Sequence, residues 1–487
     1  MLFNSFHFLL FFIVVTTAYF ALPQRFRWAW LLLASCYFYM AFVPVYILIL
    51  GFTIIIDYFA GIWIEKAEGK KRKSLLILSL VSNIAILAVF KYYNFLNGNL
   101  SYVLNGFGYQ NHIPELSILL PIGLSFHTFQ AMSYTIEVYR GHQSAERHFG
   151  IYALYVMFYP QLVAGPIERP QNLLHQFYER HEFRYERVVS GLQLMMWGLF
   201  KKVVIADRLA IVVDQVFKNP QEFGGPELLI ATIFFTFQIY CDFSGYSDMA
   251  IGAARVMGFD LMKNFRRPYF SQSINEFWTR WHISLSTWFK DYLYIPLGGN
   301  RVSVPHWYLN LLAVFLVSGL WHGANWTFII WGALHGFYLI FGLMTKALRE
   351  KTWQLLKIPN FVQSFLKTVT TFALVAYAWI FFRAQTVGDA LFISQNLFKG
   401  TGEYFLKKLS GGDIMPLAID FQTSDWLLAF GAIMFMEAVH FIQRRRSIPQ
   451  LLQSQPTALR WAVYYAVIVV IFFFGKFASR EFIYFQF

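Results

Sequence analysis

Two histidines set in apolar surroundings are the residues of this sequence best suited to chemistry. The first, His322, lies in VSGLWHGANW (317–326), where one apolar run ends, small residues follow and a second apolar run begins. Because an imidazole titrates near neutral pH, His322 is a candidate general base for the reaction of a hydroxyl with a thioester. The structural alternative is a histidine at a helix end whose ring bonds a backbone carbonyl, and the local sequence leaves both interpretations open.

The second histidine, His282, lies in EFWTRWHISLSTWFKDYLYIPLGGNR (276–301). Apolar and aromatic residues recur there every three to four positions, which predicts one amphipathic helix suited to the membrane interface or to a re-entrant wall. Pro296 with Gly298 and Gly299 is expected to stop this helix. His282 flanks the apolar stripe, and a histidine satisfied within the interface is the alternative to a catalytic one.

A polar stripe interrupts the apolar run FQIYCDFSGYSDM (237–249). Gln238, Asp242 and Gly245 follow the i, i+4, i+7 spacing of one helix face, and Asp248 continues the stripe. Because a carboxylate that faces lipid is costly, this face is expected to meet protein or a wet cavity. Hydrogen bonding between helices and the lining of a cavity both explain the stripe.

The elements that position these residues are membrane helices. The chain has 487 residues, of which 57% are hydrophobic and 14% charged, whereas soluble domains carry about 25% charged residues. This composition excludes a disordered, collagen-like or coiled-coil chain, and the uninterrupted apolar blocks exclude a transmembrane barrel. We therefore expect an all-α polytopic membrane protein with about thirteen apolar blocks, of which about eleven are transmembrane or re-entrant helices. Residues 1–487 are expected to form a single domain.

The formal net charge of +13 is carried largely by short loops between the apolar blocks. Such loops are typical of the cytoplasmic side of a membrane protein, so nucleic acid is not an expected partner. Basic residues at 25–27, 66–73 and 140–147 place the N-terminus outside and these loops in the cytoplasm. The charged segment 166–187 would then lie outside, which indicates that a neighbouring segment does not span. The two cysteines suggest neither a disulfide framework nor a zinc site, and no metal is expected.

The motifs around both histidines together carry a resemblance to a known family. WHISLSTWFKDYLYIPLGGNR (281–301), followed by SGLWHGANWTFIIWGALHG (318–336), resembles the membrane-bound O-acyltransferases, with both histidines in family order and separation. PIGLSFHTFQAMSY (121–134), YPQLVAGPIERP (159–170) and YCDFSGYSDMAIG (240–252) extend the resemblance over essentially the whole chain. The chain looks most like the bacterial alginate O-acetylase branch, which modifies extracellular or cell-wall polysaccharides.

The resemblance implies a ring of tilted helices around a central tunnel that joins the two sides of the membrane. It implies that His322 is the catalytic base. It places His282 at the second signature position, often Asn or Asp in relatives, where it would polarise the carbonyl or orient the substrate. The expected tunnel lining comprises the polar stripe and one further amide: Gln238, Asp242, Asp248 and Asn325.

The implied acyl donor is acetyl-coenzyme A, which enters from the cytoplasm as a substrate, so no permanently bound cofactor is expected. Because coenzyme A is anionic, a basic mouth is expected, and Arg280, Lys290 and Arg301 near the signature are candidates to bind it. Each of the three is also explained as a solvated basic residue. The resemblance places the chain in the inner (cytoplasmic) membrane of a bacterium, as a multi-pass protein in contact with membrane lipid.

The segment REFIYFQF (480–487) follows the last apolar span. One interpretation is an aromatic anchor at the membrane interface. The other rests on a resemblance to the tyrosine-bearing terminal motif of a small peptide in teichoic-acid D-alanylation systems. In that case Tyr484 is an acyl relay whose phenol attacks the thioester with His322 as base. Fusion of the motif to the enzyme favours polysaccharide O-acetylation over D-alanine transfer, and implies an extracytoplasmic acetyltransferase partner that recognises the polysaccharide.

Two other function classes explain parts of the sequence. In a membrane transporter or flippase, Gln238, Asp242 and Asp248 would line a substrate path, although the sequence lacks the two similar halves of many transporters. A non-catalytic scaffold of a polysaccharide-export complex would explain an anchor-like terminus, but it would leave both histidine motifs without a purpose.

Overall fold

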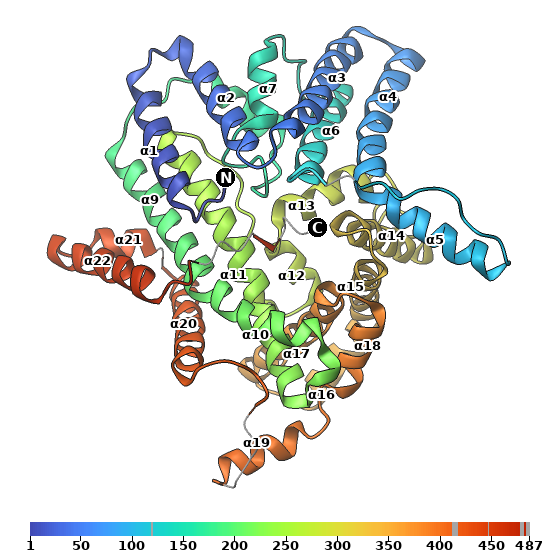
Figure 1. Cartoon of the computed structure of the whole chain (residues 1–487), viewed down its shortest axis with the longest axis vertical. Coiled ribbons are helices and arrows are strands. Elements are labelled where there is room, and N and C mark those ends of the chain that lie inside the picture. The colour runs from blue at the N-terminus through green and yellow to red at the C-terminus, as the bar shows by residue number, and fades with distance from the viewer. Residues whose placement is uncertain (118–119, 412–416, 447, 478–481, 484–487) are drawn as a thin grey trace. The chain divides into compact units, whose positions relative to one another are not determined.

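The computed structural model describes residues 1–117, 120–411, 417–446, 448–477 and 482–483. Within these ranges the regular structure is entirely helical (Figure 1). The chain divides into two compact units. The described part of unit 1 comprises Met1–Met195 and Tyr246–Lys263, and unit 2 comprises Met196–Gly245 and Asn264–Ile483.

The first part of the chain runs up to the helix Tyr185–Leu199, which begins in unit 1 and ends in unit 2. Its helices are α1 (Phe6–Ala21), α2 (Gln24–Met40), η1 (Pro44–Tyr46), α3 (Ile47–Lys66), α4 (Gly69–Leu87), η2 (Ala88–Tyr92), α5 (Tyr93–Gly106), α6 (Leu124–Arg140), α7 (Phe149–Met157), α8 (Pro170–Leu173), η3 (Leu174–Phe177) and α9 (Tyr185–Leu199).

The remaining helices belong to unit 2, apart from the C-terminal part of α11, which belongs to unit 1. They are η4 (Phe200–Ala206), α10 (Asp207–Lys218), η5 (Pro220–Glu222), α11 (Gly225–Met257), η6 (Pro268–Phe270), α12 (Ile274–Arg280), α13 (Ile283–Phe289), η7 (Lys290–Tyr294), α14 (Val304–His322), α15 (Trp326–Met344), α16 (Lys346–Leu355), α17 (Asn360–Arg383), α18 (Val387–Asn396), α19 (Thr401–Leu409), α20 (Thr423–Ile442), α21 (Ile448–Gln453) and α22 (Thr457–Phe474). Segments η2, η4 and η7 are π-helical.

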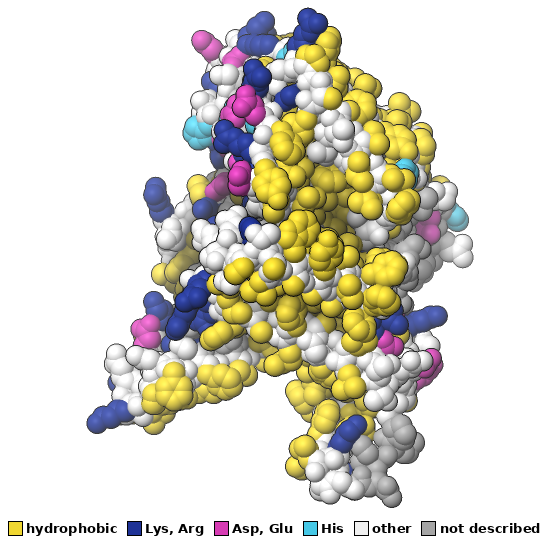
Figure 2. Space-filling model, turned by 90° about the vertical axis from the view of Figure 1, so that its left-hand side faces the viewer, with side chains coloured by type: hydrophobic (Ala, Val, Ile, Leu, Met, Phe, Trp, Pro, Cys, Tyr) yellow, Lys and Arg dark blue, Asp and Glu magenta, His cyan; other side chains and the backbone are white. Residues whose placement is uncertain are grey.

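Nine helical stretches of the described residues are long and apolar enough to cross a membrane. Figure 2 shows hydrophobic side chains over much of the face in view, as expected of a surface that meets lipid. The all-α polytopic fold is therefore confirmed, whereas the count of about eleven is not. The nine stretches are Pro44–Lys66, Gly69–Gly106, Tyr185–Lys218, Gly225–Met257, Val304–His322, Trp326–Met344, Asn360–Arg383, Thr423–Ile442 and Thr457–Phe474.

A buried hydrogen-bond network joins α3, α4 and α6 in unit 1. Asp57 on α3 accepts from Ser79 Oγ at 2.6 Å and from Asn83 Nδ2 at 2.9 Å, both on α4. Thr135 Oγ1 on α6 lies 3.2 Å from Ser79 Oγ. Polar side chains inside apolar helices thus bond one another across the helix contacts, which avoids unpaired polar groups in a membrane.

The segment between α6 and α9 comes back to the same end of unit 1 at which α6 ends, where Tyr178 donates to Glu146. Helix α7 has 9 residues, a length of about 14 Å, which is too short for a hydrocarbon core of about 30 Å. Beyond it, Glu179 O accepts from Gln24 Nε2 at 2.8 Å and His181 O accepts from Arg27 Nη1 at 2.6 Å. The charged segment 166–187 therefore lies beside the basic first turn of α2, which supports the prediction that a neighbouring segment does not span.

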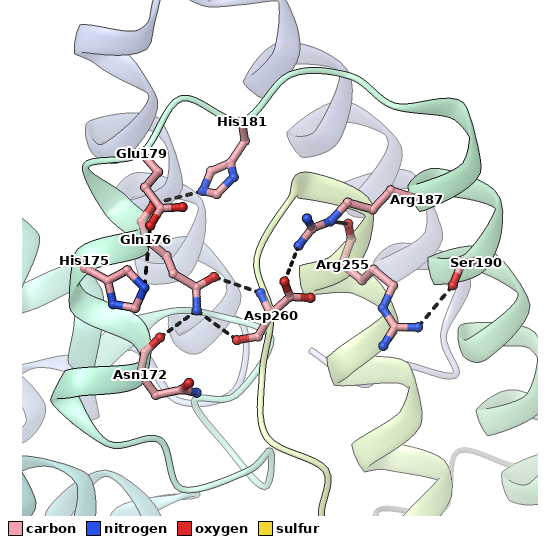
Figure 3. Close-up of polar contacts among 9 residues, drawn as sticks. All are labelled: Asn172, His175, Gln176, Glu179, His181, Arg187, Ser190, Arg255 and Asp260. Carbon is pink, nitrogen blue, oxygen red and sulfur yellow. Dashed lines mark hydrogen bonds and ion pairs between the residues drawn. The ribbon is translucent and has the colours of Figure 1, made fainter.

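Figure 3 shows the contacts of the segment 166–187 with Arg255, near the end of α11, and with Asp260, just beyond it, within unit 1. The Gln176 amide accepts from Asp260 N at 2.8 Å and donates to Asp260 O at 3.0 Å. Arg187 pairs with the Asp260 carboxylate at 2.9 Å and donates to Arg255 O at 3.2 Å. The returning segment is thus held by side chains on both of its flanks.

Glu168, in the motif 159–170, is the buried carboxyl group of this region. It accepts from Met262 N and from Asn172 Nδ2, each at 2.5 Å. Burial raises the pKa of Glu168 to about 7, although these hydrogen bonds oppose the rise. The group is therefore expected to change charge within the physiological pH range.

The predicted amphipathic helix over 276–295 is wrong in one respect, because it is broken at its centre. Helix α12 ends at Arg280, and α13 begins at Ile283. Between them His282 adopts the left-handed backbone conformation, with φ 43° and ψ 54°. The apolar spacing runs through this position without a change, so periodicity could not reveal the break.

Candidate active site

His322 occupies the C-terminal end of α14 in unit 2, as the sequence predicts for the end of an apolar run. Its Nδ1 lies 2.7 Å from the carbonyl oxygen of Ser318, one helical turn earlier. Because a carbonyl only accepts, Nδ1 must carry the proton, and in the neutral ring the lone pair then lies on Nε2. The bond to a carbonyl, which the sequence offered as the alternative to catalysis, is therefore present, and it fixes the orientation of a ring whose Nε2 can still accept a proton.

Aromatic rings surround this imidazole, which is 3% exposed. Ring centroids lie 4.9 Å away for Trp321, 4.8 Å for Trp331 and 5.5 Å for Phe382. Rings at these distances exclude bulk water from the site, which strengthens polar interactions there.

His282 lies close to the same aromatic cluster and is fully buried. Its ring centroid is 4.6 Å from that of Phe243 and 6.1 Å from that of Trp321, which also contacts His322. Burial first, and then electrostatic interaction with His322, lowers the pKa of His282 well below its ordinary value. The structure thus brings the two predicted histidines together, with His282 held neutral.

A third histidine, His335 on α15, belongs to the same cluster and was missed in the sequence. It is fully buried, and its Nδ1 accepts from Trp278 Nε1 at 3.3 Å. Trp331 joins it to the site, since this ring lies 5.1 Å from His335 and 4.8 Å from His322. An ionisable residue in the middle of an apolar run was the signal that could have identified it.

The remaining polar candidates occupy different environments. Asn325 caps α15, with its Oδ1 accepting from Thr327 N at 3.1 Å and its Nδ2 donating to Gln385 O at 3.1 Å. Gln238 is 9% exposed on the part of α11 in unit 2, and Asp248 lies on the part in unit 1. The structure gives Asn325 a structural role and does not test whether these residues line a tunnel.

The three basic candidates have local environments typical of solvated residues. Arg280 pairs with Glu276 one turn earlier on α12, at 2.5 Å. The Lys290 side chain is 61% exposed and lies 3.9 Å from Asp291. Arg301 is exposed. A role of these residues in binding coenzyme A stays a prediction.

Asp242 lies in a buried charge cluster within unit 2. Lys202 Nζ lies 2.6 Å from Asp242 Oδ1 and 2.9 Å from Asp207 Oδ1. The side chains are 1% exposed for Lys202, 5% for Asp242 and 3% for Asp207. This favours the interhelical seam over the lining of a cavity as the explanation of Asp242. The sequence did not single out Lys202, because two adjacent lysines near the end of an apolar block are typical of a loop.

The C-terminal segment reaches this cluster. Ile483 N donates to Asp242 Oδ2 at 2.7 Å, and the Phe482 ring centroid lies 4.4 Å from Lys202 Nζ. Phe482 and Ile483 are 1% and 5% exposed, so these two residues lie inside the protein rather than in lipid. Tyr484, the predicted relay, lies outside the described residues.

The cluster and the histidines share a short stretch of α11. Phe243 follows Asp242 directly, and the Phe243 ring contacts His282. The position at which the C-terminal segment is bound is therefore one residue along the helix from a side chain of the histidine site. No group of three or more metal-ligating side chains occurs among the described residues.

Known proteins are similar to this chain over most of its length. The model of the membrane-bound O-acyltransferase family matches residues 139–374, which include both predicted histidines. The probable alginate O-acetylase AlgI of Pseudomonas aeruginosa is 40% identical over 422 residues, 86% of this chain and 79% of that protein. The peptidoglycan O-acetyltransferase of Helicobacter pylori is 37% identical over 390 residues, 74% of this chain and 72% of that protein.

A more distant relative is the teichoic acid D-alanyltransferase of Streptococcus thermophilus, which is 28% identical over 242 residues, 46% of this chain and 57% of that protein. The matched family model, the coverage of the nearer relatives and the multi-pass helical fold agree with one another. This chain belongs to the membrane-bound O-acyltransferase family and is an O-acyltransferase.

Proposed function

We propose that this enzyme takes an acetyl group from cytoplasmic acetyl-coenzyme A and passes it across the inner membrane of a bacterium for O-acetylation of an extracellular or cell-wall polysaccharide. The observation that carries the proposal is the bond from His322 Nδ1 to Ser318 O, since it puts the lone pair on Nε2. The names of the relatives, an alginate O-acetylase and a peptidoglycan O-acetyltransferase, support acetyl as the group and a polysaccharide as the acceptor.

In the first step His322 acts as a general base. The attacking hydroxyl gives its proton to Nε2 while its oxygen bonds to the thioester carbon. The carbon–sulfur bond then breaks, and the coenzyme A thiolate takes the proton from Nε2 as it leaves. The surrounding rings keep water from competing with the hydroxyl.

His282 is proposed to orient the donor. Because its pKa is lowered, its imidazole is neutral and offers one N–H to a carbonyl oxygen without adding a buried charge. Arg280, Lys290 and Arg301 are proposed to attract the anionic coenzyme A through electrostatic interactions at the basic mouth.

Tyr484 is the proposed attacking hydroxyl. Support comes from Ile483, the preceding residue, which is buried and bound to Asp242 beside the histidine site. The acetylated phenol would then pass its acetyl group to a polysaccharide hydroxyl on an extracytoplasmic partner acetyltransferase, and the proton of that hydroxyl would restore the phenol. Acetyl-coenzyme A is consumed as a substrate in this scheme, and no resident cofactor takes part.

The test incubates purified protein with radiolabelled acetyl-coenzyme A and measures both free thiol and label on the protein. We expect thiol release by the wild type and its loss, by at least a hundredfold, in His322→Ala. His306→Ala is the matched control, because His306 lies near the start of the same helix and is exposed.

Tyr484→Phe separates the relay from the enzyme. Loss of label with His322 intact supports the relay, whereas acetylation of the acceptor by an unlabelled wild type removes Tyr484 from the mechanism and keeps the base. A transporter or scaffold would release no thiol in any variant, and that result would overturn the proposed function.

A further inference from the structure

Three bonds tie the end of the chain to unit 2. Arg208 Nη2 on α10 donates to Phe474 O at 2.6 Å, and Lys476 N donates to Val203 O on η4 at 2.8 Å. The third is the bond from Ile483 N to Asp242 Oδ2 at 2.7 Å. The end of α22 and the described residues beyond it are thus bound at one point each on α10, η4 and α11.

The cluster at the third point is suited to receive an N–H group. It holds Lys202 between Asp242 and Asp207 in a site from which water is excluded, and Lys202 pairs with Oδ1 of Asp242 whereas Ile483 N donates to Oδ2. Buried charges need partners, and the amide hydrogen of Ile483 supplies a further donor to Asp242. The face of Phe482 over Lys202 Nζ adds a cation–π contact that only an aromatic residue provides.

These contacts select one register of the segment. Asp242 accepts a hydrogen bond from the backbone amide of residue 483, and Lys202 makes a cation–π contact with the ring of residue 482. A slip by one residue would put Phe482 N or Tyr484 N at the carboxylate and remove the ring from the lysine.

We propose that Lys202, Asp242 and Asp207 form the docking site of the C-terminal segment, and that they are positioning residues which hold Tyr484 in register for acyl transfer. The inference rests on the proposed function for the second half of this statement, whereas docking itself rests on the contacts alone. Its benefit to catalysis is proximity, since a bound segment converts an encounter with the thioester into a step within one molecule.

The docking half is tested by hydrogen exchange and mass spectrometry on the full chain in detergent. We expect the Ile483 amide to exchange at least tenfold faster in Asp242→Asn, because Lys202 and Ile483 donate to different oxygens of Asp242 and the amide keeps only one of these two positions as an acceptor. Asp214→Asn is the matched control, since this aspartate of α10 pairs with Arg383 and is 48% exposed. Equal exchange in the wild type and Asp242→Asn would overturn docking.

The positioning half uses Ile483→Pro, which removes the donor and leaves the whole charge cluster intact, so it applies even if Asp242→Asn does not fold. We expect kcat for acetyl transfer to fall at least tenfold with KM for acetyl-coenzyme A unchanged. The double variant Asp242→Asn with Ile483→Pro is expected to be no slower than the slower of the two single variants, because both changes remove the same bond, that from Ile483 N to Asp242. An unchanged kcat in Ile483→Pro would overturn positioning.

The two proposals fail in different ways. If the wild type releases no thiol while its Ile483 amide exchanges slowly, the proposed function fails and docking stands. If thiol release depends on His322 but Ile483→Pro turns over as the wild type does, the function stands and the positioning role fails. His306→Ala is the activity control throughout.

Discussion

Lys202→Met is the substitution for which the structure predicts the largest loss of stability. Methionine matches the length of the lysine stem but removes the charge that lies 2.6 Å from Asp242 and 2.9 Å from Asp207. Removing one partner of a buried ion pair costs about 3–5 kcal/mol, because the other partner is left charged without compensation. Since all three side chains are at most 5% exposed, solvent screening reduces this figure little.

The assay follows the reaction of Cys241 with a thiol-reactive dye during heating. Cys241 is fully buried next to Asp242, so it reacts only when unit 2 opens. We expect a lower midpoint for Lys202→Met and part of the loss restored when Asp242→Asn and Asp207→Asn are added. Lys290→Met, at a side chain 61% exposed, is expected to stay within about 0.5 kcal/mol of the wild type. A midpoint of Lys202→Met equal to that of this control would refute the reasoning.

Three further variants test separate features. Gly245→Ala would put a Cβ 2.7 Å from Gly198 O, a backbone atom that cannot move aside, so we expect thermal melts to show a protein less stable by at least about 1 kcal/mol. Gly98→Ala, where nothing lies within 4 Å, should show no such loss. His282→Asn keeps a residue type that tolerates the left-handed backbone, so kcat should fall with little loss of melting temperature, whereas His282→Ala should lose both. Burial raises the pKa of Glu168 to about 7, above its unfolded value of about 4.3, so the folded chain binds more protons and stability should fall as pH rises from about 4 to 7. Glu168→Gln should flatten that dependence by up to about 3 kcal/mol in melting curves at several pH values, and an unchanged slope would contradict the assignment.

Much of the fold followed from the sequence because lipid allows few solutions. Among the residues that the structure describes, nine of the expected apolar blocks are helices long enough to span. That a segment near 166–187 does not span was also predicted, since this charged segment fell on the wrong side of the expected topology, and the shortness of α7 supports the prediction. Hydropathy counts apolar length, however, and cannot separate a helix buried among its neighbours, such as α6, from one in lipid.

The site was predictable to the extent that ionisable residues stand out in apolar runs. His322 and His282 were found in this way, and His335 could have been. The break at His282 could not be foreseen, because the side-chain spacing that predicts a helix is silent about one residue in the left-handed conformation. The partners of Lys202 were also hidden, since its contacts with Asp242 and Phe482 join residues far apart in the chain.

Each π-helical segment of the described chain carries lysine: Lys91 in η2, Lys201 and Lys202 in η4, and Lys290 in η7. A π-turn holds one residue more than an α-turn, which shifts the helical phase of the residues beyond it by about 100°. Deletion of one residue from η4 would let the helix relax to α geometry and would turn the ammonium group of Lys202 away from its carboxylates. Homologues with a one-residue gap at this point should therefore also have lost the acidic residues that face it.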